Sequence, residues 1–399
     1  MAVRRTGFAR ARKAAGFTQE SFAEAMYVDR STVARWETGA REPLPYQRPK
    51  LARLLKISTD ELDGLLSPGT TIASVEPRSA PVPVEDDEQD ALELVRRINA
   101  SDVGQETLER LEAAVDELAI AYPRTPPAAL LGRVRQHLGY VARLLDARKP
   151  LAEHQRLLVV GGWLSLLGAT VHIDLGQAPA ASARLKTAAS LAMHTGHDEI
   201  QAWVCETEAW RTLTDGDYAK ALELSQTAKA IAPTGGSVAI QATAQAGRAF
   251  ARLGQRREAY AAIHEVQQLA SGLTRPEHPE HHYRYDPDKA VAYTATTLAW
   301  VGDPAAEGYA REIIRRLGGG SDPGTWPRRV ASANIDLSLA LLVDDRLDEA
   351  CGHTMRAITS GRVVPSNRWR AAEVVRAVEA RGLPEAVELR EAYEEMRRR

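Results

Sequence analysis

The chain has 399 residues, which is enough for two or three domains of ordinary size. Hydrophobic residues make up 44% of it and charged residues 26%, a balance that excludes collagen-like, mucin-like and wholly disordered proteins. The only two cysteines are Cys205 and Cys351, so the chain cannot build a disulfide framework or a four-cysteine zinc site. This cysteine usage favours a reducing, cytoplasmic location.

Charge is distributed unevenly along the chain. Residues 1–66 carry a net charge of +4, whereas residues 67–90 carry −5 and contain four prolines. The second of these segments has too few apolar residues to offset the entropy of ordering. We therefore predict a first domain over 1–66, an acidic Pro-rich linker over 67–90 and a second folded region over 91–399.

The first domain has short helical patterns separated by turn signals. Thr18 is placed to cap a helix over 19–26, and Asp29 is placed to cap a helix over 30–37. Two short helices joined by so few residues are typical of the helix-turn-helix, whose second helix enters the major groove of DNA. The sequence therefore predicts that this domain binds double-stranded DNA.

The second helix of this pair has one apolar and one polar face. Val33 and Trp36 would lie on the inner face. The outward residues are the candidates for reading bases, because arginine bonds guanine in a bidentate fork and Ser or Thr pair permissively: Arg30, Ser31, Thr32 and Arg35. The candidates for phosphate contacts are Gln19, Arg12, Arg41, Arg48 and Lys50.

Residues 16–23 (GFTQESFA), Val28, residues 31–33 (STV) and residues 36–39 (WETG) together resemble the XRE family of phage-repressor-like helix-turn-helix domains. The resemblance implies that Gln19 contacts a phosphate and that the four outward residues of 30–37 touch bases. Tyr27 departs from the family, which usually has glycine there. Because a tyrosine at positive φ is strained, we expect an altered turn. A helical domain that binds protein instead of DNA is the alternative, and the acidic run of 67–90 is either a solvated spacer or a competitor of DNA.

From residue 91 onward, helical patterns follow one another with regular turn signals. The turn residues are Gly176, Gly216, Gly254, Gly302, Asp345 and Gly382, at intervals of 40, 38, 48, 43 and 37 residues. An alanine follows each of them by four or five positions: Ala181, Ala221, Ala259, Ala306, Ala350 and Ala386. Such a repeat predicts helical hairpins that stack into a continuous core with a concave groove. The longer period requires longer helices or inserted loops.

Three of these turn segments resemble tetratricopeptide repeats at the turn and the start of the second helix: 215–222, 254–259 and 345–350. The predicted fold class is therefore all-α, with an XRE-type domain followed by an α-solenoid of tetratricopeptide-like hairpins. This combination resembles the Gram-positive regulators that sense peptide pheromones, in which the array binds a peptide and mediates dimerisation. The resemblance implies a homodimer and a peptide or small-molecule effector, although the chain has only three asparagines to hold a peptide backbone.

The candidates for binding that effector come from the predicted inner helices. They are Tyr293, Thr297, Trp300, Arg329, Asn334, Asn367 and Arg370. The alternative is that the arginines are solvated and that Asn367 caps a helix. Residues 276–288 hold three histidines, His278, His281 and His282, and we favour a solvated or groove-capping loop over a metal site because its prolines prevent a helical His-Glu-x-x-His arrangement. We expect no metal and no cofactor.

Two further classes of protein are disfavoured. Residues 157–173 carry no formal charge, but 17 residues are short for a membrane span of about 20, so we predict a buried helix and no membrane partner. No phosphate-binding loop, dinucleotide fingerprint or nucleophile elbow is present, which argues against an enzyme. The sequence thus predicts a cytoplasmic regulator that binds a near-palindromic operator as a dimer. The alternative is a protein-interaction scaffold that uses the helix-turn-helix for docking.

Overall fold

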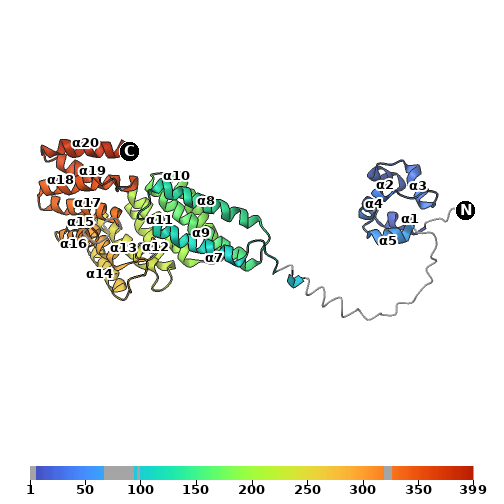
Figure 1. Ribbon diagram of the computed structural model, residues 1–399, viewed down its shortest axis with the longest axis horizontal. Coiled ribbons are helices and arrows are strands. Elements are labelled where there is room, and N and C mark those ends of the chain that lie inside the picture. The colour runs from blue at the N-terminus through green and yellow to red at the C-terminus, as the bar shows by residue number, and fades with distance from the viewer. Residues whose placement is uncertain (1–5, 67–93, 97–98, 319–325, 399) are drawn as a thin grey trace. The chain divides into compact units, whose positions relative to one another are not determined.

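A computed structural model describes residues 6–66, 94–96, 99–318 and 326–398 (Figure 1). The predicted linker over 67–90 lies outside these residues. The chain divides into two compact units, Met1–Glu85 and Asp86–Arg399. The described residues form helices and no strand, which confirms the predicted all-α class.

The first unit is a small bundle of short helices. They are α1 (Thr6–Ala14), α2 (Gln19–Met26), α3 (Arg30–Glu37), the 3-10 helix η1 (Pro45–Gln47), α4 (Arg48–Leu55) and α5 (Thr59–Leu66). Its core is built around Phe8, Phe22 and Trp36, which are almost completely buried, and around Leu51 and Leu62 from α4 and α5. The helices α2 and α3 have the bounds that the capping pattern predicts.

The turn between α2 and α3 differs in part from expectation. Thr18 caps α2 as predicted, since its hydroxyl accepts a hydrogen bond from the Ser21 N–H at 3.1 Å. Asp29 stands at the N-cap position of α3 but its side chain makes no capping hydrogen bond. Tyr27 has a φ of +57°, so the left-handed backbone conformation that usually favours glycine is adopted here by a tyrosine. The Tyr27 ring is exposed, and the Lys50 ammonium lies 4.2 Å from its centre.

The second unit is a longer array of helices, in which α17 to α20 stack in chain order (Figure 1). Its helices are α7 (Gln105–Ala121), α8 (Pro127–Asp146), α9 (Leu151–Asp174), α10 (Ala178–Thr195), α11 (Asp198–Thr214), α12 (Tyr218–Ile231), α13 (Ser237–Arg252), α14 (Arg256–Ser271), α15 (Pro287–Val301), α16 (Ala305–Gly318), α17 (Pro327–Val343), α18 (Leu347–Thr359), η2 (Pro365–Asn367), α19 (Arg368–Glu379) and α20 (Glu385–Arg398).

The repeat signals in the sequence mark the hairpins of this array. Each of the six turn residues lies between the two helices of a hairpin, from α9 and α10 to α19 and α20, and each has positive φ. Asp345 takes this conformation at +55° without being glycine. The alanine that follows each turn is buried, which lets the two helices of the hairpin approach closely. The predicted hairpin array is therefore present.

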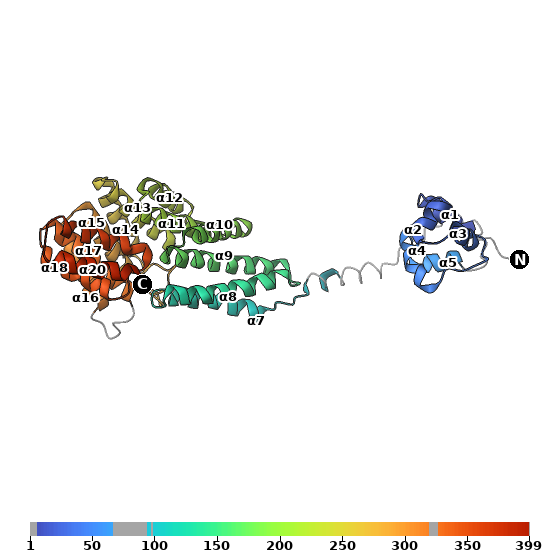
Figure 2. The ribbon, with the colours of Figure 1, turned by 90° about the horizontal axis from the view of Figure 1, so that it is seen from above.

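Two segments of the second unit are largely buried, and one of them is the apolar helix that the sequence analysis predicts to be buried. Helix α9 is long and apolar enough to cross a membrane, but 83% of its apolar window is buried in the unit, where it lies beside α8 (Figure 2). The longest interval between turns contains the segment that joins α14 to α15. Tyr283 and Tyr285 of this segment are buried in the core, so the inserted loop packs inside the array.

Candidate nucleic-acid interface and inner cavity

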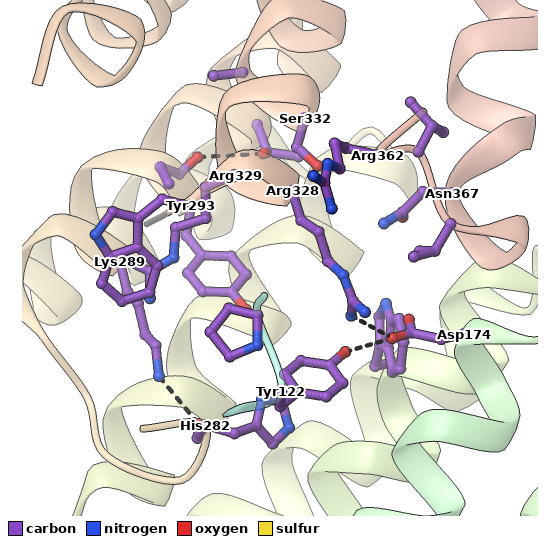
Figure 3. Close-up of a pocket in the computed structure, with 18 of the residues that line it drawn as sticks. Tyr122, Asp174, His282, Lys289, Tyr293, Arg328, Arg329, Ser332, Arg362 and Asn367 are labelled. Carbon is purple, nitrogen blue, oxygen red and sulfur yellow. Dashed lines mark hydrogen bonds and ion pairs between the residues drawn. The ribbon is translucent and has the colours of Figure 1, made fainter. Parts of the chain in front are cut away.

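The first helices of successive hairpins, α9, α11, α13, α15, α17 and α19, surround a cavity of about 240 Å³. The end of α7, the loop before α15 and the segment before α19 complete its wall. Figure 3 shows Tyr122, Asp174, His282, Lys289 and Arg328 around this space. The concave side of the array thus holds a partly open pocket with a wall that is rich in charge.

Three arginines of this wall are paired with buried carboxylates. Arg328 donates to Asp174 at 2.8 Å, and the Tyr122 hydroxyl donates to the same carboxylate at 2.8 Å (Figure 3). Arg329 donates to Asp286 at 2.8 Å, and Arg370 donates to Asp336. Burial raises the pKa of Asp174, while the charge of Arg328 opposes that rise. These pairs join helices that are distant in the sequence.

Arg248 and Lys289 are charged groups of the wall that form no ion pair with a carboxylate in the part of the chain that the structure describes. Arg248 donates to the Gln245 side-chain oxygen and lies 4.3 Å from the Tyr293 ring centre. Lys289 donates to the carbonyls of His282 at 3.0 Å and Arg284 at 2.6 Å. Burial, together with the charge of Arg329, lowers the pKa of Lys289 to about 7. Lys289 therefore titrates near neutral pH.

The first unit carries its charges on the outside of α3. Val33 and Trp36 are buried as predicted, which turns Arg30, Ser31 and Arg35 to solvent. Thr32 is half-buried at the edge of this face. Arg30 is held by Glu20 of α2 at 2.6 Å, with both side chains largely exposed. Arg35 makes no side-chain hydrogen bond or ion pair in the described part of the chain.

Arg12 is used inside the domain, contrary to its predicted contact with phosphate. Its side chain is 5% exposed, its Nε donates to Glu37 at 2.7 Å, and its Nη1 donates to the Phe17 carbonyl at 2.5 Å. The same Glu37 carboxylate accepts a hydrogen bond from the Gln19 amide at 2.6 Å. The structure therefore makes Arg12 a buried clamp between α1 and α3, and Glu37 orients the half-exposed Gln19.

The other predicted phosphate contacts lie at the surface. Arg41 is exposed just after α3, and Arg48 begins α4 with a bond to Asp63 at 2.8 Å. Lys50 is half-buried against Tyr27. Their positions are compatible with phosphate contact but no described contact tests it.

Residues 8–62 match the helix-turn-helix family model. This finding agrees with the XRE-type pattern of α2 and α3, and a helix-turn-helix domain supports a DNA-binding transcription regulator. No curated protein matches the chain. The match ends before the hairpin array, so the tetratricopeptide-like character of that array is based on its helices and turns alone.

The predicted effector residues divide into two groups. Tyr293, Arg329, Asn367 and Arg370 line the cavity, three of them from different hairpins. Thr297, Trp300 and Asn334 do not line it. The Thr297 hydroxyl donates back to the Tyr293 carbonyl, and Trp300 packs on Trp369 with ring centres 5.8 Å apart.

Asn334 lies away from the cavity, and its amide bonds within α17 and to α18. It donates to the Val330 carbonyl at 2.8 Å and its oxygen pairs with His353 at 2.8 Å. Ser332 and Asp336 of α17 line the cavity, and Asn334, two residues from each of them, lies on another face of that helix.

The histidine-rich loop separates its three imidazoles. His278 is half-exposed near Glu280, His281 bonds to Asp116 of α7 at 3.0 Å, and His282 lies 4.3 Å from the Tyr122 ring. Within the described residues, no group of three or more metal-ligating side chains converges. The loop is therefore a wall of the cavity, which is closer to the groove-capping reading than to a solvated one.

Several charged wall residues were missed by the sequence reading, although a signal for them exists. Counting back from Gly254, Gly302 and Asp345, wall residues recur at two or three of the offsets thirteen, nine and six, which lie on one face of a helix. This rule gives Gln241 and Arg248 on α13, Lys289, Tyr293 and Thr296 on α15, and Ser332 and Asp336 on α17. Polar residues at these offsets, on helices that are otherwise apolar, mark the inner face.

Proposed function

We propose that the protein is a sequence-specific transcription regulator that acts by binding rather than catalysis in the cytoplasm. Its helix-turn-helix domain binds a near-palindromic operator as a homodimer, and its hairpin array senses an effector in the inner cavity. The observation that carries the DNA-binding part is the face of α3, where Arg30, Ser31 and Arg35 are exposed over an anchored Val33 and Trp36.

The α3 face has the chemistry for reading bases. Arg35 has no protein partner among the described residues, so its guanidinium is available for the O6 and N7 of guanine. Arg30 must exchange Glu20 for a base or a phosphate. The exchange costs little because an exposed ion pair contributes only about 0–1 kcal/mol. In a dimer, the two α3 helices would enter successive major grooves about 34 Å apart.

Selection of bound duplexes from a random library tests this proposal. We expect the full-length protein at about 150 mM salt to enrich a near-palindromic motif. The Arg30→Ala/Arg35→Ala variant should lose the motif, with a cost of about 1–3 kcal/mol per base-reading arginine on the selected operator. The matched control is Arg257→Gln, which changes an exposed arginine of the second unit. Failure to enrich any motif would overturn the proposal in favour of a protein-interaction scaffold.

A further inference from the structure

The inner cavity holds an imbalance of charge that the residues described by the structure do not neutralise. After Arg328, Arg329 and Arg370 are matched with Asp174, Asp286 and Asp336, the remaining cations of the wall are Arg248, Lys289 and Arg362. The remaining carboxylates are Glu206 and Glu280. Glu206 is 5% exposed and accepts a hydrogen bond from Gln241, and burial raises its pKa toward the neutral form.

Arg248 is the most exceptional of these cations. Its guanidinium lies between Gln245 of α13 and the Tyr293 ring of α15, and no ion pair is formed by it among the described residues. Burial lowers the pKa of Arg248, and the more distant carboxylates of Glu206 and Asp336 oppose that shift only in part, while an arginine does not lose its proton at neutral pH. A buried charge that lacks a direct counter-ion destabilises a fold, because the charge has lost its hydration without a full replacement. A ligand that carries a negative charge would remove this cost, because it would supply the missing counter-ion.

The wall also offers hydrogen-bond donors without acceptors. The Nε–H groups of Arg248 and Arg370 are both buried and both lack a partner within the described residues. Such orphaned donors are rare in folded proteins and each one costs free energy. Arg362 adds a third guanidinium, exposed at the rim of the cavity, with no side-chain partner in the described part of the chain (Figure 3). A planar carboxylate matches the fork of a guanidinium in both shape and charge.

The rest of the wall limits the size and shape of the ligand. Trp210, Tyr293 and Trp326 give flat apolar surfaces beside the arginines. At about 240 Å³ the cavity lies below the usual range of drug-sized pockets, which starts near 300 Å³. One side is closed by His282, whose backbone N–H bonds to the Ala119 carbonyl at 3.1 Å and whose ring packs on Tyr122. This loop therefore limits the room for an extended peptide on that side of the cavity.

From these observations we infer that the cavity binds a small organic carboxylate with a flat apolar body, held by Arg248 inside and Arg362 at the rim. This inference deepens the proposed function, because it names the chemical class of the effector that the array would sense. It departs from the extended peptide that the sequence resemblance implies.

The test compares an acid with its neutral isostere on the full-length protein without DNA. The probes are indole-3-acetate and indole-3-acetamide, and the measurement is isothermal titration calorimetry. We expect the acid to bind one site per chain, and the amide to bind at least tenfold more weakly, because it cannot supply the counter-ion to Arg248. Equal affinity of the two compounds, or no binding of either at about 10 mM, overturns the inference.

Variants assign the binding to the two arginines. Arg248→Gln should lower the affinity for the acid at least tenfold and leave the affinity for the amide unchanged, whereas Arg248→Lys should keep part of it. Arg362→Gln should lower it by a smaller factor, and the exposed Arg257→Gln should have no effect. An unchanged affinity in the folded Arg248→Gln variant, checked by circular dichroism, overturns the assignment.

Two further comparisons distinguish a small-molecule effector from a peptide, and cavity binding from DNA recognition. A Trp-terminated nonapeptide with a free carboxyl group should bind more weakly than indole-3-acetate, and tighter binding of the peptide overturns the small-molecule reading. The duplex selection described above is independent of this titration. Loss of the motif with retained acid binding would therefore count against DNA recognition alone, and the reverse result would count against the cavity alone.

Discussion

The two units of this protein place their charges in opposite ways. In the helix-turn-helix unit, the arginines of α3 lie outside, and the main buried ion pair is Arg12 with Glu37. In the hairpin array, charged side chains from different hairpins face inward around a cavity. A charge on the outer face is free to meet a large partner such as DNA, whereas an inward charge needs a partner from the protein or from a small ligand.

The comparison teaches that similar residues have different costs in the two units. Arg30 and Glu20 are both more than half exposed, so their pair contributes little to stability. Arg370 and Asp336 are almost completely buried, so each depends on the other. The following predictions, in order of decreasing effect, break or sharpen this contrast.

The largest effect is expected for Asp336→Ala in the array. Asp336 is 2% exposed and accepts hydrogen bonds from Arg370 and from the Thr296 hydroxyl. Its loss leaves a buried arginine unpaired and should lower the free energy of unfolding of the second unit by about 3–5 kcal/mol, measured by urea denaturation. The exposed Asp344→Ala should change it by less than about 0.5 kcal/mol. A loss below about 1 kcal/mol would show that Arg370 finds another partner.

For Glu37→Gln we expect a smaller decrease in the free energy of unfolding, in the first unit. Arg12 would lose its counter-ion and Gln19 would lose its hydrogen-bond acceptor. Because Glu37 is 12% exposed, we expect a loss of about 2–3 kcal/mol. Hydrogen exchange of amides within 6–66, measured on the full chain, reports this loss, and Glu24→Gln on the exposed side of α2 is the matched control. Unchanged protection would contradict the clamp.

Lys289 makes the stability of the array depend on pH. Its pKa is about 7 in the folded protein and about 10.5 in the unfolded chain, so the unfolded chain binds more protons between these values. Stability from this group should therefore rise with pH from 7 to 9, by up to about 1.4 kcal/mol per unit. Urea midpoints at several pH values should show the rise in the native protein and a flatter profile in Lys289→Met. Equal slopes in the two would contradict the assignment.

The smallest effect concerns the turn of the helix-turn-helix. Tyr27 has positive φ, a conformation that costs a non-glycine residue about 1 kcal/mol or more. Tyr27→Gly should therefore stabilise the first unit relative to Tyr27→Ala by about 1 kcal/mol, since both variants lose the contact with Lys50 and only glycine relieves the backbone. Thermal denaturation of the two variants measures the difference, and equal stability would argue against backbone strain.

Much of the local structure could be predicted from the sequence because its causes are local. The bounds of α2 and α3 follow from capping positions and helical periodicity, and the six turn residues follow from a repeated turn chemistry. The same periodicity predicted that Val33 and Trp36 face the core, and both are buried. It failed for Arg12, because a basic residue near a predicted DNA-binding helix suggests phosphate, and nothing local reveals that Glu37 lies across the domain core.

The sequence by itself determined the helices, the turns and the face of α3, since these depend on residues within a few positions of one another. Only the tertiary structure decided which charges meet. Arg328 and Asp174 are 154 positions apart, and Arg252 and Glu373 are 121 apart, so their pairing depends on how the hairpins stack. The cavity, its unpaired Arg248 and the loop that closes it arise from that stacking, because a concave surface exists only when several repeats pack together.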